Sequence, residues 1–323
     1  MNMFEQARSA DSVSGPPSQG DYFFDRAFQW LAKAFAWAIL AVVAALLLEV
    51  GSKAIPAIKD YHIGFLTSTT WDANKDQFGI LPEIWGTLYS SFLALIIAGF
   101  FGVMMAIFLT QDFLPPRLAA IFRIIVELLA AIPSVVYGLW GIFVVIPAIR
   151  PLANWLNESF GMIPFFSTTL SGPGMLPAAL VLAIMVLPTI AAVSQDALRL
   201  VPYRIKEAAY GLGATRWEAI LKVMLPTAST GIFGALVLGF GRALGETMAL
   251  AMLVGNSNQI SLSLFSPANT LAALLALNFP EAGETEVKVL MYAALVLMLI
   301  TLAVNVAGTA IMTMTNKQAG GGR

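Results

Sequence analysis

Six long apolar runs constrain this chain more than any other feature of its sequence. A bilayer core about 30 Å thick needs about 20 residues of apolar helix to span it. The runs of this kind are residues 28–50, 86–110, 118–149, 176–195, 228–255 and 287–312. The 323 residues are 58% hydrophobic and only 11% charged, whereas soluble domains are about a quarter charged. The sequence therefore predicts an all-α integral membrane protein with six transmembrane helices.

The composition also limits the chemistry that the chain can carry. It has no cysteine, which excludes disulfides, thiolate zinc sites and iron–sulfur clusters. A lone histidine, His62, cannot form a metal centre, and a net charge of −1 does not favour nucleic-acid binding. The sequence lacks the Gly-x-x-x-x-Gly-Lys-Ser/Thr loop that cradles nucleotide phosphates, and no catalytic carboxylate pair or Ser–His arrangement occurs within the spans. We therefore expect a chain that is not an enzyme and has neither cofactor nor metal.

Lysine and arginine in the short loops orient the chain. Ten of them fall on the side that holds both chain ends and the loop at 196–227, against four on the other side. Because cytoplasmic loops are enriched in Lys and Arg, we expect both termini to be cytoplasmic. Residues 1–20 and 316–323 are predicted to be tails around a transmembrane domain at 21–315.

Two stretches depart from a simple series of spans. The run at 118–149 is longer than one helix needs, and Pro133 and Pro147 are expected to kink or end it. The segment 269–278 is apolar but too short to cross a bilayer. We expect a short helix there, capped by Asn269, that lies at the outer interface or re-enters the membrane. Either form is a candidate docking surface for an external partner.

The predicted cytoplasmic loop at 196–227 carries the most specific local pattern. Pro202 can open a first helix, and Gly211 and Gly213 can break it. We therefore expect a short helix that ends in a turn outside the membrane.

A second helix is predicted directly after this turn. Thr215 precedes Glu218 by three residues, which is the spacing of a capping box. Pro226 is expected to close the unit just before the fifth span. Together the two parts predict a helix–turn–helix.

The residues of this loop leave two interpretations open. Small Ala208 and Ala209 beside charged Glu207 suit a short helix lodged in the groove of another protein, with Trp217 as the bulky anchor of the contact. A basic loop that rests on anionic lipid is the alternative.

A charged pair is predicted within the fifth span. Arg242 and Glu246 are four residues apart and would share one face of a continuous helix, which Gly241 and Gly245 would leave open. Ionisable residues in the hydrocarbon region indicate function by default. One interpretation is a buried ion pair that pins the span to its neighbours. In the other, Arg242 binds an oxyanion on a permeation path, because guanidinium matches phosphate geometry bidentately.

The second interpretation includes a basis for selectivity. Phosphate near neutral pH keeps at least one proton, whereas sulfate keeps none. Glu246 could therefore accept a hydrogen bond from phosphate and repel sulfate. Thr247 follows it as a further polar group of the predicted path.

The third run supplies more polar candidates for such a path. Glu127 either pairs with Arg123 one turn earlier or faces the path itself. Pro133 frees backbone carbonyls, and Ser134 and Tyr137 lie close by in the sequence as polar groups that could line the path.

The loop at 196–227 resembles the Glu-Ala-Ala motif of ABC-importer permeases. The matching residues are Glu207, Ala208, Ala209, Gly213, Leu225 and Pro226, while Val223 stands where Ile is usual. In that family the loop is a coupling helix that docks on a separate ATPase subunit. The resemblance therefore favours a protein partner over lipid.

Further segments resemble the PstC family, permease subunits of bacterial high-affinity phosphate ABC importers. They are residues 86–88, 127–141, 207–226 and 239–249. The resemblance implies a type I importer fold in the bacterial inner membrane, with a PstA-like second permease, a PstB-like ATPase dimer and a PstS-like external phosphate-binding protein as partners. A permease for another oxyanion such as sulfate or molybdate, a secondary transporter or channel, and a non-transporting sensor subunit remain alternatives.

Overall fold

The computed structural model of the chain describes residues 19–320 except residue 112. Within this part, six helical segments are long and apolar enough to cross a membrane. They are Tyr22–Tyr61, Leu81–Thr110, Ser134–Phe160, Met175–Arg199, Arg216–Leu244 and Glu284–Met314. The predicted all-α membrane fold with six transmembrane helices is confirmed. Most of the tail predicted at 1–20 lies outside the described residues.

The chain forms two compact units, residues 1–52 and 53–323. The described part of the first unit is helix α2 (Gln19–Tyr61), which continues into the second unit. Apolar residues lie all around the axis of α2, as expected for a helix that faces lipid. The second unit continues with α3 (Gly64–Thr67) and a small antiparallel hairpin of β1 (Trp71–Asp72) and β2 (Gln77–Phe78).

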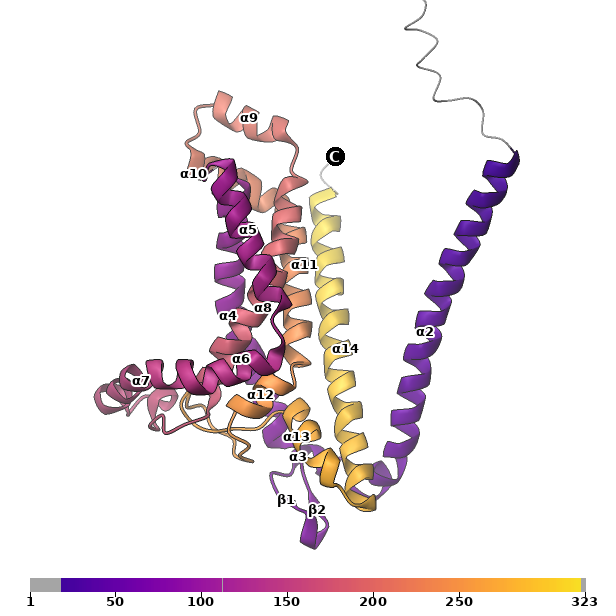
Figure 1. Cartoon of the computed structure of the whole chain (residues 1–323), viewed down its shortest axis with the longest axis vertical. Coiled ribbons are helices and arrows are strands. Elements are labelled where there is room, and N and C mark those ends of the chain that lie inside the picture. The colour runs from indigo at the N-terminus through magenta and orange to yellow at the C-terminus, as the bar shows by residue number, and fades with distance from the viewer. Residues whose placement is uncertain (1–18, 112, 321–323) are drawn as a thin grey trace, which may run out of the picture. The chain divides into compact units, whose positions relative to one another are not determined.

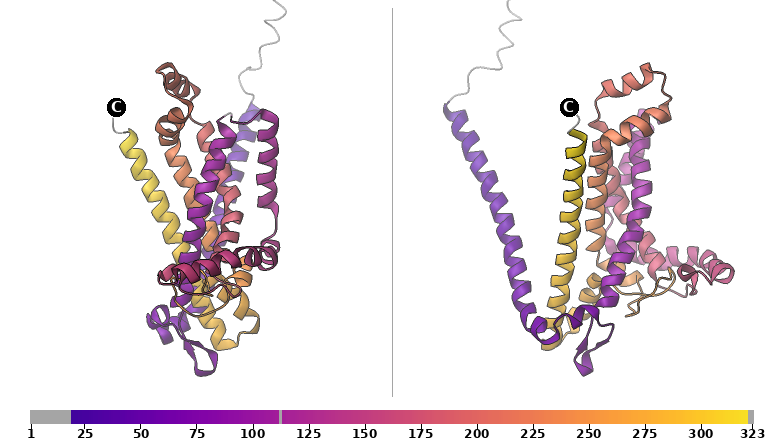
Figure 2. Two further views of the ribbon diagram at one scale, coloured as in Figure 1. Left: turned by 90° about the vertical axis from the view of Figure 1, so that its left-hand side faces the viewer. Right: turned by 180° about the vertical axis from the view of Figure 1, so that it is seen from behind.

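Four long helices form the bundle of the second unit. They are α4 (Leu81–Thr110), α8 (Met175–Arg199), α11 (Leu225–Leu244) and α14 (Glu284–Gly320). α4 and α11 both pack on α8, and α14 packs on α11 (Figures 1 and 2). α14 extends into the segment predicted as a C-terminal tail, whose last three residues lie outside the described part.

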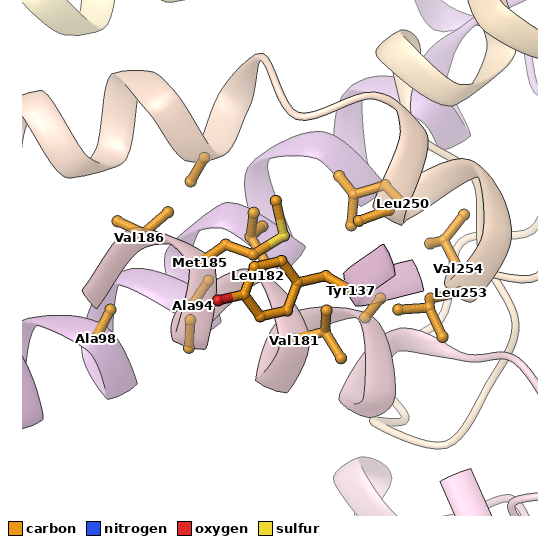
Figure 3. Close-up of a cluster of buried hydrophobic side chains, with 14 of the residues drawn as sticks. Ala94, Ala98, Tyr137, Val181, Leu182, Met185, Val186, Leu250, Leu253 and Val254 are labelled. Carbon is orange, nitrogen blue, oxygen red and sulfur yellow. The ribbon is translucent and has the colours of Figure 1, made fainter. Parts of the chain in front are cut away.

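Small and branched side chains fill the centre of this bundle. Ala94 and Ala98 of α4 lie among residues of α8 such as Val181, Leu182 and Val186 (Figure 3). Small side chains let membrane helices approach closely, which strengthens van der Waals packing where lipid removes the hydrophobic driving force. α8 is thus held as the central element on which the polar groups described below are placed.

The third apolar run is broken at Pro133, which corrects the predicted span at 118–149. α5 (Pro116–Ala131) runs along the bundle, whereas α6 (Ser134–Trp140) and α7 (Ile146–Phe160) run across one end of it (Figure 1). Proline cannot donate the hydrogen bond that the Leu129 carbonyl would accept in a continuous helix. The Tyr137 hydroxyl donates to that carbonyl instead, at 2.8 Å.

Pro147 does not end the helix, which was one of the two outcomes expected for it. A π-helical turn (Gly141–Val145) joins α6 to α7 without a gap, and Pro147 lies in the first turn of α7. The π-helical turn directly before Pro147 interrupts the regular α-helical ladder, and such turns accompany kinks inside helices.

The fifth apolar run ends earlier than predicted. α11 stops at Leu244, where the N–H of Gly245 donates to the Arg242 carbonyl at 3.3 Å, and a separate α12 (Met248–Leu253) follows. The predicted span at 228–255 is therefore two helices, and Arg242 and Glu246 do not share one helical face.

The short apolar helix expected between the fifth and sixth spans, α13 (Leu271–Asn278), is part of the fold. Its N-cap is Thr270 and not Asn269 as predicted, because the Thr270 hydroxyl accepts a backbone hydrogen bond three residues on, at 3.2 Å. Thr87 of α4 accepts a second one, from the Leu271 N–H at 2.9 Å. The first turn of α13 is buried, so half of the surface predicted to dock a partner is covered by the chain itself.

The remaining short elements lie in the connections. They are α9 (Tyr203–Gly211), α10 (Arg216–Glu218), a π-helical turn (Ala219–Met224) and the 3-10 turns Ala73–Lys75, Pro164–Phe166 and Phe279–Glu281. α9 and the C-terminal end of α14 lie at the same end of the second unit (Figures 1 and 2).

Gly86 gives a test of how tightly α4 meets the segment before α13. A Cβ at Gly86 would lie 1.9 Å from the Asn269 carbonyl oxygen, so Gly86→Ala must push the two backbones apart. Overpacking of this kind costs about 1–3 kcal/mol, and we expect a lower thermal unfolding midpoint in detergent. Gly172→Ala is the control because nothing lies within 4 Å of its Cβ position. Equal midpoints for the two variants would contradict this packing.

Candidate functional site

Arg242 lies in the last turn of α11 and points its guanidinium toward α8. Its Nη1 donates to the Thr189 hydroxyl at 3.3 Å, joining residues 53 positions apart. The guanidinium is also within electrostatic range of the Tyr137 hydroxyl. On the opposite side, Gly241 lets Asn305 of α14 approach, since a Cβ there would lie 3.2 Å from the Asn305 amide oxygen. Arg242 remains exposed and can therefore bind a ligand.

Glu246 and Thr247 form the short link between α11 and α12. One Glu246 carboxylate oxygen accepts a hydrogen bond from the Ala249 N–H at 3.5 Å, and the Thr247 hydroxyl donates to the Gly245 carbonyl at 3.2 Å. Free N–H groups at the start of a helix favour a carboxylate. Both residues are half-buried. Glu246 thus has a local structural contact that the sequence did not predict.

A groove of about 390 Å³, with both charged and apolar residues in its lining, runs between α5 and α8. Its lining from α5 is Arg123, Val126, Glu127 and Ala130, and its lining from α8 is Pro188, Thr189, Ala192, Gln195, Asp196 and Arg199. We call this the α5–α8 groove. Glu127 therefore lines the same groove as Thr189, the residue to which Arg242 donates. In the described part of the chain no ion pair within 4.0 Å joins Arg123 to Glu127, so the local pairing is not formed.

Ser134 and Tyr137 occupy different surroundings. Ser134 is half-buried at the first position of α6. Tyr137 is only 5% exposed within the apolar core, among Val181 and Met185 (Figure 3). Its hydroxyl bond to Leu129 gives it a definite role in the break at Pro133.

The structure thus brings Arg242, Thr189 and Glu127 into one polar region. Thr189 and the groove residues Gln195 and Arg199 were not predicted. Gln195 and Arg199 are four positions apart and so share one face of α8, which could have indicated these two residues, whereas no such spacing indicated Thr189. Within the described residues no group of His, Asp and Glu could hold a metal ion.

The loop at 196–227 folds much as its pattern predicts. α9 begins after Pro202, Gly213 follows its end with φ of +84°, and the Thr215–Glu218 capping box is present in both directions. Pro226 does not close the unit, contrary to prediction. α10, the π-helical turn and α11 form one continuous helix, and Pro226 lies inside it, two residues after the π-helical turn.

The exposed face of α9 holds the residues expected to meet a partner. Glu207 and Ala208 are exposed, whereas Ala209 is buried. A cleft of about 330 Å³ between α9 and the following helix is lined by Ala209 and Gly213, among others. The loop lies beyond the end of the bundle (Figure 1), and this cleft gives it a shaped surface.

Arg216 and Trp217 attach this loop to the connection between α4 and α5. The Arg216 guanidinium lies 4.1 Å from the centre of the Phe113 ring, and the Trp217 ring lies 5.3 Å from it. Arg216 also donates to the Gln111 carbonyl. Cation–π contacts of this kind stabilise by about 0.5–1 kcal/mol at exposed sites. Trp217 is still 52% exposed, so it can contact a partner as well as Phe113.

Known proteins are similar to this chain in sequence and in fold. Residues 98–319 match the family described as "Binding-protein-dependent transport system inner membrane component". "Phosphate transport system permease protein PstC" of Haemophilus influenzae is 39% identical over 298 residues, 91% of this chain and 94% of the relative. The protein of the same name in Xylella fastidiosa (strain Temecula1) is 37% identical over 310 residues, 94% of each chain.

Two solved structures share the fold at low sequence identity. A chain of a bacterial alginate ABC transporter, in complex with an alginate pentasaccharide-bound periplasmic protein, matches with a TM-score of 0.59 and 16% identity, covering 88% of this chain and 95% of that one. A chain of the MetNI methionine ABC transporter in an inward-facing conformation matches with a TM-score of 0.55 and 19% identity, covering 73% and 95%.

Gly213 gives a test of the conformation of the loop. Its positive φ costs a residue with a Cβ about 1–2 kcal/mol, while no atom lies within 4 Å of the Cβ position. Gly213→Ala should therefore speed hydrogen exchange of the Ala214 N–H, which donates to Ala209, by about 5–30-fold. Gly211→Ala is the matched control, with equal space and no positive φ. Unchanged exchange in Gly213→Ala would contradict the account.

Proposed function

We propose a transport function from one premise: this chain belongs to the family of binding-protein-dependent transport system inner membrane components. It is accordingly a multi-pass inner-membrane protein with a type I ABC importer permease fold. Its function is that of a permease subunit of a phosphate ABC importer. The observation that identifies phosphate as the substrate is the similarity to phosphate permeases along nearly the whole chain.

Arg242 is proposed as the phosphate ligand of the path. It is exposed, sits where α11 ends, and donates from one nitrogen of its guanidinium to Thr189. Its other donors are left to form the bidentate contact that suits phosphate oxygens. The helix break supports this role because interrupted membrane helices place polar groups where a substrate can reach them.

Glu246 and Thr247 are proposed to act next to Arg242, with Glu127, Ser134 and Tyr137 along the path. Glu246 would accept a hydrogen bond from a protonated oxygen of phosphate. Sulfate has no such proton, and two like charges in contact repel by several kcal/mol. Tyr137 would contribute by holding the break at Pro133 in shape.

The loop at 196–227 is proposed to dock on an ATPase subunit and to transmit its movement. Glu207, Ala208, Ala209, Gly213, Trp217 and Pro226 would form or shape the contact. Since this chain has no nucleotide-phosphate loop, the hydrolysis would belong to a PstB-like dimer. A PstA-like permease would supply the other half of the path, and a PstS-like protein would deliver phosphate from outside.

Movement would follow from the attachment of the loop within the chain. Arg216 and Trp217 connect it to Phe113, and its second helix continues without interruption into α11, which ends beside Arg242. Closure of the ATPase dimer on ATP would therefore shift α11 and open the path outward. Hydrolysis would return it to the inward-facing form.

Uptake of radiolabelled phosphate tests this function. Cells that carry this chain as the only copy should take up phosphate in the presence of excess sulfate. Arg242→Ala should lower uptake by about 10–100-fold, because charge-assisted hydrogen bonds contribute about 1.5–3 kcal/mol, while the complex still assembles. Uptake that is blocked by sulfate would show that the substrate is another oxyanion.

Glu246→Gln tests the proposed selectivity separately. The glutamine amide oxygen can still accept the Ala249 N–H, so the start of α12 is kept, and only the negative charge is lost. We expect sulfate to compete with phosphate at concentrations at least about tenfold lower than for the native chain. If sulfate is rejected as strongly as before, Glu246 does not discriminate between the two anions.

A further inference from the structure

We propose that the α5–α8 groove is a second phosphate site, on the side of Arg242 that leads to the coupling loop. This inference rests on the proposed function and extends the path beyond Arg242. The groove is a cavity of about 390 Å³, within the range of small-ligand sites. Both of its walls carry charged groups.

The groove combines donors and acceptors in the way that protonated phosphate requires. Arg123 and Arg199 present guanidinium groups, and Gln195, which is only 5% exposed, adds an amide. Glu127 and Asp196 present carboxylates in the same lining. Guanidinium donates to the anionic oxygens of phosphate, and a carboxylate accepts from its remaining O–H. Sulfate offers no hydrogen for the second contact.

Arg123 is the group that most needs a ligand. Its Nε is buried and has no hydrogen-bond partner in the described part of the chain, and no ion pair is formed with Glu127, which lines the same cavity. A buried donor left unsatisfied costs about 1–3 kcal/mol, and more when it is charged. Arg199, by contrast, lies 3.9 Å from Asp196. Because Nε itself is buried, an anion in the groove would contact the terminal nitrogens of Arg123, and its charge would offset that of the unpaired guanidinium.

The position of the groove in the fold gives it a role in the passage of phosphate through the chain. Thr189, at one end, accepts the hydrogen bond from Arg242. Arg199, at the other, is the last residue of α8, a few residues before α9. The two residues are ten positions apart, which is about 15 Å along the helix. The groove thus extends from the proposed ligand Arg242 to the end of the bundle where the ATPase would dock.

A single cysteine can report occupancy, because the chain has none of its own. Ala192 lines the groove and is exposed. We would label Ala192→Cys with N-ethylmaleimide in inside-out membrane vesicles that hold the assembled complex. The reagent is uncharged, but the reactive thiolate responds to nearby charge, so the rate of each variant with phosphate is compared with its own rate without phosphate at the same pH. Millimolar inorganic phosphate should slow labelling severalfold, and sulfate at equal ionic strength should not.

Substitutions of single arginines test whether this protection arises from phosphate bound in the groove. Arg123→Gln should abolish protection by phosphate. Arg199→Gln, at a side chain that is 46% exposed and so tolerant of replacement, should weaken it even if Arg123→Gln fails to assemble. Arg117→Gln is the matched control, since Arg117 lies on α5 outside the groove, and it should leave protection unchanged.

Three results would overturn the second site. They are no protection by phosphate, equal protection by sulfate, and protection that survives both groove substitutions. Uptake of phosphate by the intact cells from which the vesicles are made is measured in parallel. Phosphate uptake without protection would rule out the second site and leave the proposed function standing. Absence of phosphate uptake by the native chain would rule out the proposed function itself.

Discussion

Backbone hydrogen bonding in the absence of water governs where this fold can be irregular. A helix in lipid satisfies its own N–H and C=O groups, and an interruption is tolerated only where protein groups replace the lost bonds. At Pro133 the replacement is the Tyr137 hydroxyl on the Leu129 carbonyl. At the end of α11 it is the local contacts of Gly245 and Glu246. Polar residues of the proposed path lie near these two breaks because non-helical backbone is tolerated there.

The two breaks also connect the site to the coupling loop. α5 leads from the connection that Arg216 and Trp217 contact to the break at Pro133, and its inner face forms one wall of the α5–α8 groove. The helix that begins at the capping box of Thr215 ends one residue before Gly245. In the proposed function, a displacement of the loop would reach Arg242 and Thr189 along these two helices. The site needs no catalytic group, since the proposed task is to bind an anion and to move.

Features that depend on local chemistry were predictable from the sequence. Apolar length gave the six spans, and the Thr215–Glu218 spacing and the position of Gly213 gave the shape of the loop. The run at 118–149 was misassigned because α5, α6 and α7 are all apolar, and hydropathy carries no information about direction. α11 was extended past Leu244 because no proline ends it. The contact of Arg242 with Thr189 joins residues 53 positions apart, and it depends on how α11 packs against α8.

The central claim is that a separate ATPase drives phosphate through this chain by way of the loop at 196–227. The most direct measurement is the accumulation of radiolabelled phosphate in proteoliposomes that contain the complete complex and its external binding protein, with ATP enclosed or absent. The account predicts that phosphate rises above its outside concentration only when ATP is enclosed. The same accumulation of phosphate without ATP would contradict the account. Movement of phosphate down its own gradient would indicate a channel, and accumulation driven by an ion gradient would indicate a secondary transporter.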